Sequence, residues 1–242
     1  MKSVLNILYK IYSFLIALPI FLVVTIITAL IITIAALIGD KDYTDYFMSK
    51  WWSRITLAVF LIGVKVEGRE KLNKRQSYVF LANHQGYFDI FLIYGYLGHN
   101  FKWMMKEYLR KIPFVGFACT ASGQIFVDDT RAGIKKAVEQ SRKTLTSGMS
   151  MVIFPEGTRT YDGTMSEFKR GAFMLSNEIG LPIVPMTING SFHVFSRKAK
   201  SVTHGSLSLI IHEPIQPEYY QAKPTKQFMQ EVFDIINNDL KP

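Results

Sequence analysis

Residues 79–93 read VFLANHQGYFDIFLI, and this stretch decides the expected fold of the chain. Its first four residues are apolar, as in a strand that is buried on both faces of a sheet. Asn83 and His84 end the strand, and a short turn then leads to Asp89 and an apolar helix. A strand that is followed directly by a helix is the basic unit of a layered α/β domain.

The same alternation of strands and helices continues on both sides of this stretch. Runs rich in β-branched and aromatic residues predict strands over residues 64–67, 78–82, 125–127, 151–154, 183–188 and 207–211. Helices are expected over residues 90–97, 132–145, 172–179 and 226–240. Most of these strands lack polar alternation, so we expect an α/β domain whose largely parallel sheet is flanked by helices.

The first 63 residues differ from the rest of the chain. Their uncharged run over residues 11–39 is long enough to cross a membrane, which takes about 20 apolar residues. Residues 51–64 are too few to span, but Trp51 and Trp52 beside Arg54 are typical of a headgroup boundary. We therefore predict a membrane-embedded two-helix segment in residues 1–63 and one domain in residues 64–242. Two helices packed on a soluble domain are the alternative.

Charge and cysteine content limit the possible functions. The chain of 242 residues has a net charge of +9, but no basic run or recognition motif accompanies it, so a nucleic-acid partner is not expected. The single cysteine, Cys119, excludes an intramolecular disulfide and a multi-cysteine zinc site. We interpret it as a small buried hydrophobic residue. Four histidines lack a spaced partner and are not predicted to be functional: His99, His193, His204 and His212.

His84 and Asp89 lie on a turn short enough to bring the carboxylate near the imidazole. A carboxylate on one ring nitrogen fixes the tautomer and raises the basicity of the other. No Ser or Cys lies in residues 83–89, which favours a base that acts directly on a substrate hydroxyl. Asp89 could equally serve only as an N-cap or first-turn residue of the following helix. This segment alone supports both interpretations.

A second polar cluster follows the strand at residues 151–154. The turn after Pro155 presents Glu156, Gly157, Thr158 and Arg159. A guanidinium with nearby backbone amides and a hydroxyl suits a phosphate, because its fork matches two oxygens. Lys169 and Arg170 precede the next helix, whose N-terminus also attracts anions. A local ion pair between Glu156 and Arg159 is the alternative. Both clusters follow strand ends, where open α/β sheets place their ligands.

Four segments resemble, in the same order, the sequence blocks of the glycerolipid acyltransferase family. They are NHQGYFD (residues 83–89), which resembles the His-x4-Asp block, GQIFV (123–127), FPEGTR (154–159), which resembles the phosphate-site block, and IVPM (183–186). The match extends over about residues 64–191 and, within the family, looks closest to lysophosphatidate acyltransferases, which also begin with a hydrophobic helical pair. The supporting residues of these blocks are Asn83, Gly123, Phe126, Pro155 and Pro185.

The resemblance implies roles for individual residues. His84 would be the general base and Asp89 its partner, while Glu156, Gly157 and Arg159 would contribute to a site for the acceptor's phosphate. In the second block, Asp129 occupies a place where the family usually has Arg. We expect Arg131, two residues further, to supply that charge.

The implied reaction moves a fatty acyl group from a thioester of coenzyme A or acyl carrier protein to the free hydroxyl of lysophosphatidic acid. The product would be phosphatidic acid for phospholipid biosynthesis, and no metal or other cofactor is implied. The first alternative is another acceptor: a lysophospholipid, an aminolipid or glycerol phosphate. The second is a non-catalytic protein that binds anionic membranes. Residues 64–242 would be the catalytic domain, on the cytoplasmic face of the cytoplasmic membrane.

Overall fold

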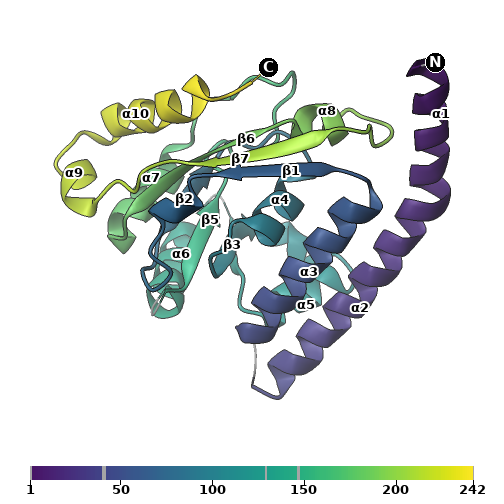
Figure 1. Cartoon of the computed structure of the whole chain (residues 1–242). Helices are drawn as coiled ribbons and strands as arrows, with labels where there is room; N and C mark the ends of the chain where they lie inside the picture. The colour runs from purple at the N-terminus through teal and green to yellow at the C-terminus, as the bar shows by residue number, and fades with distance from the viewer. Residues whose placement is uncertain (1, 40–41, 129, 146–147, 242) are drawn as a thin grey trace.

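The computed structural model describes residues 2–39, 42–128, 130–145 and 148–241, and Figure 1 shows how they are arranged. The chain begins with a long helical rod, turns back in a second helix and then enters a sheet with helices on both faces. The predicted fold class, a largely parallel α/β sheet behind an N-terminal helical pair, is confirmed.

The sheet has seven strands among the described residues. They are β1 (Gly63–Glu67), β2 (Val79–Ala82), β3 (Phe101–Lys106), β4 (Ile125–Val127), β5 (Ser150–Ile153), β6 (Ile183–Asn189) and β7 (Ser206–Ile211). Their order is β1-β7-β6-β2-β5-β3-β4, and within this described sheet only the β6–β7 pair is antiparallel. The central strand β2 has parallel neighbours on both sides, so its carboxyl end lies beside the carboxyl ends of β5 and β6.

The helices divide between the N-terminal rod and the two faces of the sheet. They are α1 (Lys2–Tyr12), α2 (Leu18–Leu37), α3 (Tyr43–Val59), α4 (Asp89–Tyr96), α5 (Val115–Ala121), α6 (Arg131–Thr144), α7 (Arg170–Ile179), α8 (Ser191–Phe195), α9 (Pro217–Gln221) and α10 (Thr225–Asn238). A π-helical turn, η1 (Ser13–Ala17), joins α1 to α2, and the 3-10 turns are η2 (Arg69–Lys71) and η3 (Glu107–Lys111).

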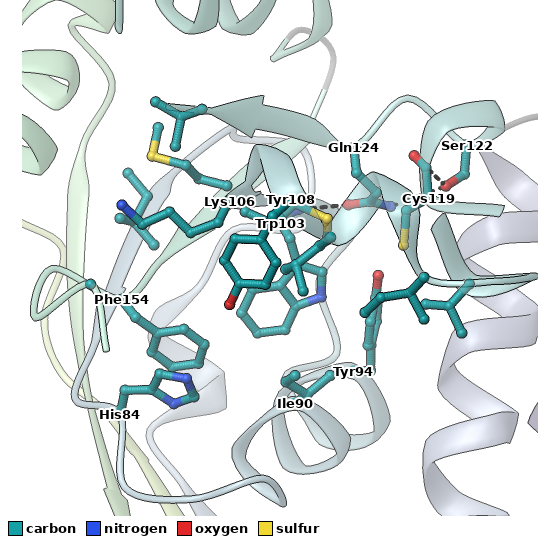
Figure 2. Close-up of a pocket in the computed structure, with 18 of the residues that line it drawn as sticks. His84, Ile90, Tyr94, Trp103, Lys106, Tyr108, Cys119, Ser122, Gln124 and Phe154 are labelled. Carbon is teal, nitrogen blue, oxygen red and sulfur yellow. Dashed lines mark hydrogen bonds between the residues drawn. The ribbon is translucent and has the colours of Figure 1, made fainter. Parts of the chain in front are cut away.

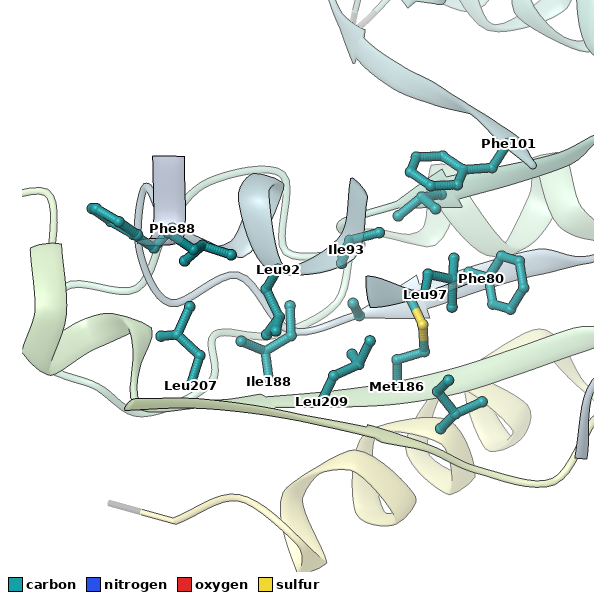
Figure 3. Packing of buried hydrophobic residues seen from close by; sticks show 14 of the residues in the cluster. Phe80, Phe88, Leu92, Ile93, Leu97, Phe101, Met186, Ile188, Leu207 and Leu209 are labelled. Atoms are coloured by element: carbon teal, nitrogen blue, oxygen red, sulfur yellow. The ribbon is translucent and has the colours of Figure 1, made fainter. Parts of the chain in front are cut away.

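Alternate residues of the central strands β2 and β5 face two separate cores. Phe80 and Ala82 of β2 pack on the side of α3 and α4, while Val79 and Leu81 pack on the side of α6, α7 and α10. Figure 3 shows the first core: Phe88, Leu92, Ile93 and Leu97, in and around α4, face Met186 and Ile188 of β6 and Leu207 and Leu209 of β7. Because both faces are covered, strands such as β2 and β6 are buried along their whole length.

The six predicted strands and four predicted helices are all present, with boundaries that agree within two residues. The strand β3 was not predicted. Its sequence, FKWMMK, carries Lys102, which lies 1% exposed and forms ion pairs with Asp42 and Asp45 of the α3 segment, both at 3.0 Å. Lysine is almost never fully buried without a partner, and the buried partner of Lys102, Asp45, lies 57 residues away in the sequence.

The N-terminal helices differ in detail from the prediction. Residues Val4–Leu37 form one helix that is long and apolar enough to cross a membrane, and most of its large side chains are exposed. The second helix is not residues 51–64 but α3, which begins at Tyr43 and ends at Val59. It packs on both α2 and α4, and the Trp52 indole donates a hydrogen bond to Thr25 of α2 at 2.9 Å.

The helix α3 has its polar side inward. The side chains that it buries include Asp45, Ser49, Ser53 and Thr56. Its exposed side carries three aromatic rings, and the ring of Phe47 contacts those of Tyr43 and Trp51. A helix on a water-exposed surface has the opposite distribution, with its apolar stripe toward the core.

Candidate active site

The turn after β2 is held in place by Asn83. Its side-chain oxygen accepts a hydrogen bond from the amide of Ile188 at 2.7 Å, and its amide nitrogen donates to the Ile188 carbonyl at 2.9 Å. These two bonds fix the end of β2 to β6. Gly86 then passes so close to α8 that a Cβ would lie 2.5 Å from the carbonyl oxygen of Ser191, so the turn leaves no room for a larger residue.

The structure brings His84 and Asp89 together. Nδ1 of His84 lies 2.7 Å from Oδ2 of Asp89, and the same oxygen accepts hydrogen bonds from the amides of Gln85 at 2.7 Å and Gly86 at 3.0 Å. Asp89 is the first residue of α4, but its bonded oxygen faces the turn rather than the helix, whose N-cap is Phe88. Nδ1 therefore carries the proton that is shared with Asp89, and Nε2 is left as the basic nitrogen.

Two aromatic rings support the imidazole from one side. The ring of Phe154 stacks on that of His84 with 3.9 Å between centroids and 7° between planes. Trp103 stacks on the other side of Phe154 at 5.3 Å. Within the described part of the chain, no serine, threonine or cysteine side chain is hydrogen-bonded to the His84 ring. This arrangement favours a base that acts on a substrate hydroxyl.

Glu156 is placed differently from the phosphate-site role that the resemblance implies. It is buried and does not line the cavity; one carboxylate oxygen accepts the amide of His84 at 2.7 Å and the other accepts the amide of Ser166 at 2.8 Å. Burial raises its pKa to about 7. No ion pair joins it to Arg159 among the described residues, so the surface ion-pair alternative is not observed. Its contacts fit a residue that positions the His84 turn.

Two of the three cations of the second cluster, Arg159 and Lys169, line the same cavity as His84, and Arg170 does not. Gly157, Thr158, Arg159 and Lys169 line the same cavity as His84. Gly157 has a φ of +69°, and the Lys169 side chain lies over it so closely that a Cβ would be 2.9 Å from Lys169 Cε. The Arg159 guanidinium lies over the ring of Tyr87, 3.6 Å from its centroid. Arg170, the first residue of α7, is exposed and is not part of the cavity wall.

Other predicted residues fall into three groups. The carbonyl of Pro155 accepts the Lys169 amide at 2.8 Å, and Pro185 pairs with Leu81 in the sheet. Gly123 lies two residues before β4, and Phe126 is the middle residue of that strand. Asp129 and the side chain of Arg131 lie outside the described residues. His99, His193, His204 and His212 do not line the cavity.

Sequence reasoning missed one cation of this region. Arg197, just after α8, donates a hydrogen bond to the Thr158 hydroxyl at 3.3 Å, and its guanidinium lies over the ring of Tyr161. The only signal in the sequence is the short basic pair at residues 197–198, which does not stand out in a chain with 28 Lys and Arg.

The cavity beside His84 has a volume of about 470 Å³. Figure 2 shows His84 and Phe154 at one end, Trp103 and Tyr108 in the middle, and Cys119 and Ser122 at the other end. Its far wall includes residues of α2 and α3, and most of its lining is apolar. Burial raises the pKa of the Cys119 thiol to about 12, so Cys119 stays a neutral thiol rather than a nucleophilic thiolate.

Residues 63–189, just over half of the chain, match the family model described as Acyltransferase. The chain belongs to this acyltransferase family. Among relatives of this acyltransferase is the chloroplastic 1-acyl-sn-glycerol-3-phosphate acyltransferase of Arabidopsis thaliana, with 32% identity over 70% of this chain and 48% of the relative. A 1-acyl-sn-glycerol-3-phosphate acyltransferase of Chlamydomonas reinhardtii is 29% identical over 87% of this chain and 63% of its own length. The chain thus spans about half to two thirds of these curated relatives.

A solved structure is similar over almost the whole chain. The crystal structure of the 1-acyl-sn-glycerophosphate (LPA) acyltransferase PlsC from Thermotoga maritima superposes with a TM-score of 0.81 and 25% identity. The match covers 98% of this acyltransferase chain and 95% of the other. The likeness therefore includes the N-terminal helices as well as the sheet.

Proposed function

We propose that this acyltransferase moves a fatty acyl group from an acyl thioester to the free hydroxyl of lysophosphatidic acid, forming phosphatidic acid. The observation that carries the proposal is the His84–Asp89 pair at one end of an apolar cavity, next to Arg159 and Lys169. A base for a hydroxyl, cations for a phosphate and an apolar space for an acyl chain lie in one site. The names of the relatives support the same acceptor.

The proposed chemical step uses His84 as a general base. Nε2 takes the proton of the acceptor hydroxyl, and the hydroxyl oxygen attacks the carbonyl carbon of the thioester. The new ester C–O bond forms as the C–S bond of the thioester breaks. The departing sulfur then receives the proton from His84, which returns the imidazole to its starting state. Asp89 holds Nδ1–H throughout and stabilises the transient imidazolium. Glu156 acts through the turn, because it holds the amide of His84.

The acceptor's phosphate is proposed to bind Arg159 and Lys169. Arg159 offers a planar fork that matches two phosphate oxygens, and stacking on Tyr87 fixes the plane of that fork. Lys169 adds a second charge beside the backbone of Gly157. Arg197 donates a hydrogen bond to Thr158, which lines the cavity next to Arg159, so its charge adds to the positive potential at the phosphate site.

The remaining parts of the proposal concern the donor and the membrane. The apolar cavity would hold the acyl chain, because each buried methylene contributes about 0.8 kcal/mol. The donor would be a thioester of coenzyme A or of acyl carrier protein, with no metal or other cofactor. Residues 1–63 would be the anchor and residues 64–242 the catalytic domain, on the cytoplasmic side of the cytoplasmic membrane. The outward aromatic side of α3 and the apolar rod support this placement.

The purified chain, assayed with labelled acyl-CoA and acyl carrier protein thioester against a panel of acceptors, tests the reaction. We expect turnover with lysophosphatidic acid, and little with lysophosphatidylcholine, an aminolipid or glycerol 3-phosphate. His84→Ala should lower the rate by about 10²–10⁴-fold, as expected for loss of a general base. His193→Ala, an exposed histidine outside the cavity, is the matched control. Normal turnover of His84→Ala, or preference for another acceptor, would contradict the proposal.

A further inference from the structure

The segment between β3 and β4 has an exposed apolar surface that the reaction does not require. We define the η3–α5 surface as the exposed side chains of Tyr108, Ile112, Phe114 and Phe117, which are 67%, 41%, 50% and 74% exposed. Four large apolar side chains within ten residues are a concentrated patch rather than the scattered exposure that is normal in soluble proteins.

The η3–α5 surface is continuous with the apolar rod. The helix α5 packs directly against α2, where Ala118 meets Ala29 and Ile32 in a small core of their own. Next to these contact residues along the chain, α2 exposes Ile26, Leu30 and other aliphatic side chains. Any lipid that surrounds α2 therefore reaches α5 as well.

The charges of this segment fit the edge of an anionic bilayer. Lys111 is exposed and makes no ion pair among the described residues. Arg110 is held between Glu107, at 2.5 Å, and the ring of Phe126. Aromatic rings next to a cation are typical of the headgroup region, where the rings enter the acyl boundary and the cation stays with the phosphates.

The same segment forms one wall of the cavity. Tyr108, Leu109, Ile112, Val115 and Cys119 line the cavity, while Phe114 and Phe117 are exposed and do not line it. Figure 2 shows Tyr108 and Cys119 on this wall, between the His84 end and the far end of the cavity. Tyr108 and Ile112 thus belong to both the cavity wall and the η3–α5 surface.

We propose that the η3–α5 surface is a second membrane-binding site, which inserts Ile112, Phe114 and Phe117 into the lipid interface beside α2. Its occupant is a phospholipid bilayer that contains anionic lipid. This contact would hold the cavity wall against the leaflet, so that a lipid acceptor has only a short distance to travel between the bilayer and His84. The inference goes beyond the proposed reaction, and its main test requires no activity.

The test places a fluorescent label on the surface of the full chain reconstituted in vesicles of phosphatidylcholine and phosphatidylglycerol. The label is attached to Phe117→Cys in a Cys119→Ala background. Met174→Cys in the same background is the control, because Met174 is also an exposed apolar residue but lies on α7, on the opposite face of the sheet. We expect doxyl-labelled lipid to quench the label at position 117 several-fold more than at position 174, and aqueous iodide to show the reverse order.

Two results would overturn the inference. Strong quenching by iodide at position 117 would mean that the surface is open to water. Protection from both quenchers would mean that protein, such as a second copy of the chain, covers it. A separate measurement uses Phe114→Ser/Phe117→Ser, for which we expect a several-fold higher KM for acceptor presented in vesicles but an unchanged KM for a short-chain monomeric acceptor. A wild-type chain without activity, together with a lipid-quenched label at position 117, would refute the proposed reaction and leave this inference standing.

Discussion

Two buried carboxylates next to His84 have different tasks, and the atoms that they contact decide which. Three donors converge on one oxygen of Asp89, among them Nδ1 of His84, so this residue orients the imidazole directly. Both oxygens of Glu156 accept main-chain amides, so it fixes the backbone that carries His84. One residue sets the tautomer of the base and the other sets its place.

Asp89→Asn tests the charge of the orienting residue. Because His84 Nδ1 and the amides of Gln85 and Gly86 all contact Oδ2, an asparagine oxygen in that place keeps these bonds but lacks the charge that stabilises the imidazolium. The rate should therefore fall by about 10²–10⁴-fold while the melting temperature changes little. Glu178→Gln, which removes an exposed carboxylate of α7, is the matched control for charge. Equal rates for Asp89→Asn and the control would show that the pair has no role in the reaction.

Arg159→Lys tests the acceptor site. Lysine keeps the charge but cannot form the two parallel hydrogen bonds of a guanidinium, nor stack on Tyr87 in the same way. We expect the KM for lysophosphatidic acid to rise by about tenfold or more, equivalent to roughly 1.4 kcal/mol of binding, with the KM for the thioester nearly unchanged. A rise confined to the thioester would move Arg159 to the donor site.

The raised pKa of Glu156 predicts how stability depends on pH. In the fold its pKa is about 7, because burial disfavours the charged form, against a usual value of 4.5. Between these two values the unfolded chain has released this proton and the folded chain has kept it, so stability falls as pH rises from about 4.5 to 7. The titration of Glu156 lowers the free energy of unfolding by up to about 3 kcal/mol over this range.

Unfolding of the wild type and of Glu156→Gln, measured from pH 4.5 to 8, checks this prediction. Glutamine does not titrate, so the variant should lack this part of the slope, although it loses one amide contact at every pH. Parallel stability curves, offset by a constant amount, would mean that folding does not raise the pKa of Glu156.

At the scale of elements, the junction between α3 and β3 is ionic rather than apolar. Lys102 of β3 enters the space under α3 and pairs with Asp45, whose carboxylate also accepts the Gln124 amide at 3.0 Å. The helix that borders the proposed membrane surface is thus fixed to the sheet by a buried charge pair.

Lys102→Met should therefore destabilise the fold strongly. Removal of one partner leaves a buried carboxylate without its cation, which typically costs about 3–5 kcal/mol. The double variant Lys102→Met/Asp45→Leu should recover much of this loss, because replacing both partners of a buried pair is often nearly neutral. Melting temperatures in detergent report both effects. A double variant less stable than the single one would show that the pair itself stabilises the junction.

At the scale of the whole molecule, apolar surface is concentrated on one side. The rod of α1 and α2, the aromatic side of α3 and the η3–α5 surface adjoin one another, whereas α6 and α10 on the opposite face of the sheet are amphipathic helices packed on the second core. A one-sided distribution of this kind orients a protein on a bilayer and leaves the opposite face in water.

Full-length protein should therefore sediment with membranes and stay there after washing with high salt or alkali. Salt weakens contacts between exposed charges, since the Debye length falls to about 3 Å at 1 M, but it does not release an apolar anchor. A protein held only by its net charge of +9 would be released.

In intact cells, a protease-sensitive tag at the C-terminus should be protected from external protease. Cleavage from outside would contradict the proposed orientation.

The sequence by itself determined the elements and the local part of the site. Strands such as β2 are apolar throughout, so neighbouring residues were sufficient to predict them. The turn between His84 and Asp89 spans only five residues, which allowed the pair but left the capping role of Asp89 open until the structure placed the two side chains together. The four sequence blocks added the family, which the comparisons confirm.

The tertiary structure alone decided how distant segments combine. Glu156 reaches the amide of His84 across 72 residues, and Lys102 is buried only because Asp45, 57 residues away, neutralises it. Arg197 joins Thr158 across 39 residues. Contacts of this range depend on strand order and helix packing, whereas hydrophobic periodicity records only which face of each element is buried. For that reason β3 and the positioning role of Glu156 became visible only in the folded chain.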